Sequence, residues 1–108
     1  MAKQISEGAS IAFTHKHKFK RDNTQVKLDI FGLPELYLFG NKIAWCDVET
    51  KQIKFTMCGW NSRTTKDRLS ALGIIVVNRD SLPYWKVNQQ TLKPISSTGV
   101  YTTNIIVQ

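Results

Sequence analysis

The sequence CGWNSRTTKDRL, residues 58–69, has the pattern of a junction between a β-strand and an α-helix. Thr64 and Asp67 have the spacing of a capping box, in which the threonine hydroxyl accepts a hydrogen bond from the backbone N–H three residues later and the acidic side chain bonds back to the cap. Thr65 is an alternative cap. Gly73 suits the left-handed position that ends many helices. The stretch therefore predicts one short helix over about residues 65–72.

Strand patterns lie on both sides of this junction. Apolar and histidine positions alternate with polar and lysine positions over residues 10–20, which predicts a strand with one half-buried face. A turn at residues 21–24 leads into a returning strand at residues 26–30, and Gly40-Asn41 has the composition of a two-residue hairpin turn. Further strands are expected over residues 42–47, 53–58, 74–77, 81–89 and 99–107.

These elements together predict an α+β fold, a small antiparallel sheet built from sequential hairpins with one short helix packed on it. The length of 108 residues is that of one domain, which we place at residues 10–108, and the polar residues 1–9 are expected to form a flexible leader. No segment approaches the roughly 18 apolar residues of a membrane span, and the N-terminus has no apolar core of a secretory signal. We therefore expect a cytoplasmic protein without membrane contact.

The chain is strongly basic, with 15 Lys and Arg against 8 Asp and Glu and a formal net charge of +7. This charge is typical of proteins that contact nucleic acid. On a strand, alternate lysines would project from one face about 6.8 Å apart and could follow a phosphate backbone, although edge strands also carry lysines to prevent aggregation. Basic residues at a helix start can likewise bind phosphate or only face water. The predicted phosphate contacts are Lys16, Lys18, Lys20, Arg21, Arg63, Lys66 and Arg68.

Nothing in the sequence indicates an active site. It has no glycine-rich phosphate loop, no nucleophile elbow and no metalloprotease helix, and its acidic residues are scattered. Cys46 and Cys58 lack the close spacing of a structural zinc site, and strand pairing would hold them too far apart for a disulfide. We expect two free thiols, no metal, no cofactor and no catalytic activity.

With the segments LYLFGNKIAWCD, KFTMCGWNSRTTKDRLSAL and YWKVN in this order, the chain resembles a family of small, uncharacterised bacteriophage proteins. In that family a hairpin of pattern hGN-IA precedes a GW-T-TT-RLN turn and helix, and an aromatic strand follows. The matching positions are Gly40, Asn41, Ile43, Ala44, Gly59, Trp60, Thr64, Thr65, Arg68, Leu69, Tyr84 and Trp85. The resemblance covers about residues 36–88, without the N-terminal basic hairpin or the C-terminal tail, and Ser70 departs from the usual asparagine. It implies a phage origin and action in the cytoplasm of an infected bacterium.

The charge and the resemblance together predict a small, non-catalytic phage accessory protein that binds DNA or RNA through phosphate contacts. The alternative is a phage protein that docks on a host bacterial protein, such as a defence nuclease or the transcription machinery, and inhibits or redirects it. Tyr37 and Trp85 are then the expected partner-binding anchors, while Trp60 is expected to pack against the helix or its return strand. The last strand either closes the sheet or pairs edge to edge in a homodimer.

Overall fold

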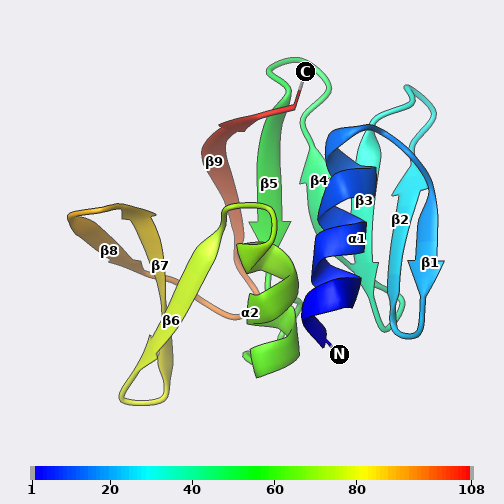
Figure 1. Cartoon of the computed structure of the whole chain (residues 1–108). Coiled ribbons are helices and arrows are strands. Elements are labelled where there is room, and N and C mark those ends of the chain that lie inside the picture. Colours follow the sequence, from blue (N-terminus) through cyan, green and yellow to red (C-terminus); the bar gives the residue numbers. More distant parts are fainter. Residues whose placement is uncertain (1, 108) are drawn as a thin grey trace.

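The computed structural model describes residues 2–107 and places them in two antiparallel sheets and two helices (Figure 1). The elements are α1 (Ala2–Thr14), β1 (Phe19–Arg21), β2 (Thr24–Leu28), β3 (Pro34–Leu38), β4 (Asn41–Cys46), β5 (Gln52–Thr56), α2 (Arg63–Ser70), β6 (Ile75–Arg79), β7 (Leu82–Asn88), β8 (Thr91–Pro94) and β9 (Val100–Ile106). The larger sheet has the strand order β1-β2-β3-β4-β5-β9, and the smaller one has the order β6-β7-β8. The α+β prediction is confirmed, but the predicted single sheet and single helix are wrong.

The largest correction concerns the N-terminus. Residues 1–9 were expected in a flexible leader and residues 10–20 in a strand. Met1 lies outside the described residues, α1 occupies residues 2–14, and only residues 19–20 of the predicted strand are extended, as the start of β1. The buried side chains of Ile5, Ala9, Ala12 and Phe13 follow the spacing of one helix face. Of these four residues only Phe13 also belongs to the apolar row of the predicted strand, so the alternation over residues 10–20 did not identify the element.

The face of the larger sheet that α1 and α2 cover is apolar. Its central cross-strand row is Phe19, Val26, Leu36, Ala44, Phe55 and Tyr101, one residue from each strand in register. Figure 1 shows both helices on this side of the sheet. The burial of this row and of the facing helix residues is the main source of stability for the domain.

The smaller sheet joins the same core. The ring of Trp85 on β7 packs edge-on against Phe55 with centroids 5.2 Å apart, and lies 6.2 Å from Tyr101. The predicted hairpin of residues 74–77 with 81–89 is confirmed as β6 and β7, while β8 was not predicted. The last strand is confirmed as β9, which pairs with β5 across a long sequence separation rather than with its neighbour in sequence.

Two local details also differ from the sequence prediction. Leu38 pairs with Asn41, so the β3–β4 turn is formed by Phe39-Gly40, one residue earlier than expected. Within the described residues no helix is long and apolar enough to cross a membrane.

Candidate nucleic-acid interface on the open face of the larger sheet

The face of the larger sheet opposite the helices carries aromatic and basic side chains in two cross-strand rows. The strand register defines them. The first row is Lys20, Gln25, Tyr37 and Lys42. The second row is Lys27, Glu35, Trp45, Lys54 and Thr102. Neither helix covers these rows, and the smaller sheet packs on the other face, so we refer to them as the open face.

Two half-buried aromatic rings lie near the centre of the open face, each beside a lysine. The ammonium of Lys27 lies 4.6 Å from the centroid of Tyr37, and that of Lys42 lies 5.3 Å from the centroid of Trp45. Both are cation–π distances. Tyr37 also donates its hydroxyl to Glu35 at 3.2 Å, and burial, followed by the charge of Glu35, raises the pKa of the tyrosine. These contacts hold the two rings in defined positions.

The charges on the open face are mainly positive. Lys42 pairs with Glu35 at 3.2 Å, and Lys54 pairs with Asp47 at 3.4 Å. Within residues 2–107, Lys20 and Lys27 form no ion pair, although Lys27 lies over Tyr37. Exposed ion pairs contribute only about 0–1 kcal/mol to stability. A phosphate could therefore replace either carboxylate as the partner of its lysine at little cost.

The lysines predicted to form one stripe at the N-terminus do not share a strand. Lys16 follows α1 with a positive φ of 58°, and Lys18 lies in the connection that leads to β1. Lys20 and Arg21 belong to β1 but have opposite parity, so only Lys20 joins the open face. The predicted stripe is therefore wrong as a geometric unit, because the helix ends where the strand was expected to run.

Arg68 is not an exposed phosphate contact. Its side chain is only 3% exposed and donates from Nε to Thr24 Oγ1 at 2.7 Å, from Nη1 to Ser6 Oγ at 2.9 Å and from Nη2 to Asn23 Oδ1 at 3.3 Å. It thus connects α2 to α1 and to the start of β2. Burial lowers the pKa of the guanidinium. The burial and the three hydrogen bonds indicate a structural role.

The helix junction also differs in its cap. Ser62 accepts a hydrogen bond from the N–H of Thr65 at 3.2 Å, so the predicted capping box of Thr64 and Asp67 is wrong and α2 begins at Arg63. Gly73 has the predicted left-handed conformation, with φ of 92°. Arg63 is exposed and Lys66 is half-buried on the first turn, where their predicted phosphate contact stays a prediction.

The two predicted protein-docking anchors lie in different environments. Trp85 is 8% exposed and belongs to the core, so it is not a surface anchor, whereas Tyr37 lies on the open face. Trp60 is 64% exposed, so most of its side chain is not buried against α2 or the return strand. Trp45 was not among the predicted site residues, although its place on a predicted strand next to Ala44 was a usable signal.

No group of three or more potential metal ligands occurs among residues 2–107. Cys46 and Cys58 are free, as predicted. Burial raises the pKa of both thiols and so disfavours the thiolate that a metal ligand or nucleophile needs.

Comparison with known proteins identifies a family over nearly the whole chain. The family described as Kyanoviridae Gp96 protein matches residues 2–104. The match confirms the resemblance to small phage proteins and extends it to α1 and β1 and into β9, well beyond the expected residues 36–88. No curated protein and no solved structure matches this chain.

Proposed function

We propose that this protein, which belongs to the Kyanoviridae Gp96 family of phage proteins, binds single-stranded DNA or RNA on the open face of its larger sheet. The observation that carries the proposal is the placement of Tyr37 and Trp45 on neighbouring strands, each with a lysine beside its ring. A half-buried ring on a sheet can stack with a base while lysines around it contact the phosphates. Such binding does not depend on the nucleotide sequence.

Single strands fit this surface better than a duplex does. The bases of a duplex are stacked on one another and cannot lie on rings fixed to a sheet, whereas the bases of a single strand can. Adjacent strands are about 4.8 Å apart and alternate residues about 6.8 Å apart, so Tyr37 and Trp45 can contact neighbouring bases of one strand. The net charge of +7 adds a long-range attraction that salt would weaken.

Titration of fluorescein-labelled 15-mers of dT and of U at several salt concentrations tests the proposal. Removal of a stacking ring typically costs about 1–3 kcal/mol, so we expect Tyr37→Ala and Trp45→Ala each to weaken binding by roughly 5- to 150-fold. Phe31→Ala is the matched control, because Phe31 is an exposed ring at the β2–β3 turn, outside both rows.

Charge reversal provides an independent readout. The double variant Lys20→Glu, Lys27→Glu should reduce the slope of log affinity against log salt by about 1.4, on the basis of roughly 0.7 for each lost phosphate contact to a single strand. Affinity within twofold of the wild type in both ring variants would contradict the proposal. The comparison of dT with U decides between DNA and RNA.

Docking on a host protein is the second candidate function, and it is favoured by the two exposed rings of Phe39 and Trp60. Pull-down from a nuclease-treated bacterial lysate separates the candidates: a stoichiometric protein that remains after digestion supports docking, and loss of all partners supports nucleic acid. Both functions place the protein in the cytoplasm of the infected bacterium. An edge-to-edge homodimer through β9, an outer strand of the sheet, is a further proposal that sedimentation can test.

A further inference from the structure

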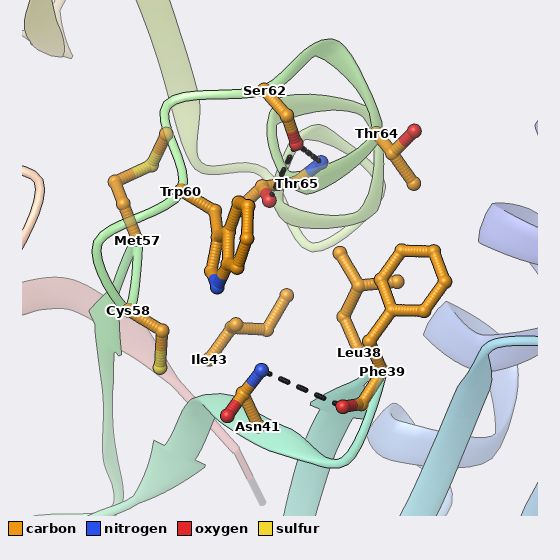
Figure 2. Close-up of a pocket in the computed structure, with 10 residues that line it drawn as sticks. All are labelled: Leu38, Phe39, Asn41, Ile43, Met57, Cys58, Trp60, Ser62, Thr64 and Thr65. Carbon is orange, nitrogen blue, oxygen red and sulfur yellow. Dashed lines mark hydrogen bonds between the residues drawn. The ribbon is translucent and has the colours of Figure 1, made fainter.

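An apolar cavity of about 490 Å³ lies between the β3–β4 turn and the start of α2 (Figure 2). Leu38, Ile43 and Met57 line it and are buried. The strand register shifts between Leu36 and Tyr37, and Ile43 and Ala44 are consequently both buried, as expected at a β-bulge. The cavity therefore opens on the helix side of the sheet, away from the open face, and its volume is in the range of ligand-binding pockets.

The rings of Phe39 and Trp60 stand at the cavity (Figure 2), and both are mostly exposed, at 70% and 64%. Phe39 also has φ of 51°, in the left-handed region that is unfavourable for a bulky side chain. Asparagine would suit this turn better. Phe39 thus exposes an apolar ring and occupies a strained backbone position, neither of which stabilises the fold. A role in binding accounts for both.

The polar groups that line the cavity are largely engaged with one another. The hydroxyls of Ser62 and Thr65 are 2.9 Å apart and form one hydrogen bond, and the thiol of Cys58 donates to the carbonyl of Lys42 at 2.9 Å. The Asn41 amide lies 3.5 Å from the carbonyl of Phe39. Among the lining groups, this leaves chiefly the Trp60 indole N–H and the Thr64 hydroxyl to bond an entering group, so the buried part of that group should be mainly apolar.

The charges beside the cavity are basic. Arg63 and Lys66 belong to the same first turn of α2 as the lining residues Thr64 and Thr65, and no acidic side chain lines the cavity. Neither cation forms an ion pair within residues 2–107. The surroundings therefore favour a ligand with negative charge next to its apolar group.

We propose that this cavity binds a bulky apolar side chain, phenylalanine, tryptophan or leucine, carried by an acidic segment of a partner protein. A nucleobase fits less well, because most of its polar edge atoms would be buried without partners. A second copy of this chain would bring Arg63 and Lys66 against a surface with the same charge. The site is distinct from the open face, so either function can fail while the other holds.

Three acetylated seven-residue peptides serve as probes: EDEFDED, its alanine counterpart EDEADED and its basic counterpart KRKFKRK. Binding is followed by the indole N–H resonance of Trp60, assigned by loss of the signal in Trp60→Phe. Burial of one phenylalanine ring predicts that EDEFDED binds at least about tenfold more tightly than EDEADED. The basic peptide should bind most weakly. The Trp60 resonance should shift on addition of EDEFDED, and it should shift less at equal concentrations of the other two peptides.

Two variants test the geometry of the site. Phe39→Asn removes one ring while its turn conformation remains favourable, and the double variant Arg63→Glu, Lys66→Glu reverses the charge; each should weaken EDEFDED binding at least about fivefold. Arg79→Glu, Lys86→Glu is the matched control, because both residues are exposed on the smaller sheet. Thermal unfolding of every variant verifies that it is folded.

Three results would overturn the proposal. The first is equal affinity for EDEFDED and EDEADED. The second is a Trp60 resonance that moves with the dT 15-mer and not with EDEFDED, which would assign the cavity to nucleic acid. The third is a resonance that shifts with protein concentration alone while sedimentation detects a dimer, which would assign it to a second copy.

Discussion

Replacement of Arg68 by alanine should destabilise the domain strongly, because the guanidinium is buried and joins three parts of the fold. It donates to Ser6 on α1, to Thr24 on β2 and to Asn23 in the preceding turn, at distances of 2.7–3.3 Å. A hydrogen bond to a charged group contributes roughly 1.5–3 kcal/mol, so three such bonds contribute about 4.5–9 kcal/mol before the cost of burying the charge. That cost is several kcal/mol.

The net expectation for Arg68→Ala is a loss of about 3 kcal/mol in the free energy of unfolding. In a domain of about 100 residues this lowers Tm by roughly 12 °C or more. Arg68→Met keeps most of the aliphatic packing and removes the buried charge, so we expect about half of that loss. Urea unfolding, followed by the fluorescence of the core residue Trp85 in a Trp45→Phe, Trp60→Phe background, measures both values.

The same variants test the assignment of Arg68 as structural. At a temperature where all the variants are folded, Arg68→Met should bind the dT 15-mer as the wild type does, whereas Lys20→Glu, Lys27→Glu should bind it more weakly. If Arg68→Ala unfolds within about 0.5 kcal/mol of the wild type, the hydrogen-bond reasoning is refuted. If Arg68→Met keeps its stability and loses oligonucleotide affinity, Arg68 contacts phosphate after all.

Three further predictions concern single positions. Phe39→Asn should raise the free energy of unfolding by about 0.5–1 kcal/mol in urea titrations, because asparagine tolerates the left-handed φ of 51°; a destabilised variant would show that the ring packs. Gly73→Ala should cost about 1–2 kcal/mol in the same assay, because φ is 92° and the new Cβ would lie 3.3 Å from Ile105 Cδ1; unchanged stability would contradict this. Hydrogen bonds from the backbone N–H groups of Thr50 and Glu49 lower the pKa of Asp47 below its ordinary value of 3.8. The stability that this carboxylate contributes is therefore present above pH 3.8 and is lost as the pH falls through the lower pKa of the folded state. Asp47→Asn should therefore show a smaller loss of stability between pH 5 and pH 2, measured by urea unfolding at each pH, and an unchanged acid dependence would be inconsistent with it.

The central hairpins were predictable from sequence because their signals are local. Turn residues at Gly40 and a repeat of apolar positions specify β3, β4 and β5, and the strand-to-helix junction at residues 58–69 specifies the approximate position of α2. The phage family was likewise visible in the motifs of these segments, and the family match over residues 2–104 confirms it. Each of these features depends on residues that lie within a few positions of one another.

The two candidate surfaces depend on contacts between distant segments, and the sequence did not indicate them. The alternation over residues 10–20 fitted a strand, but the apolar face of the larger sheet offers a helix more burial than a solvated edge would, and α1 forms there. In the sequence nothing distinguishes Arg68 from a surface arginine, but in the structure it bonds to α1 and β2. The sequence likewise allowed Trp85 to be exposed, whereas its ring packs against Phe55.

The sequence by itself determined the antiparallel α+β character, the basic charge and the family. Only the tertiary structure decided which face of the sheet the helices cover, and hence that Tyr37 and Trp45 remain on the open face while Trp85 is buried. The physical reason is that alternation along a strand defines two faces, but packing against other elements determines which face meets water.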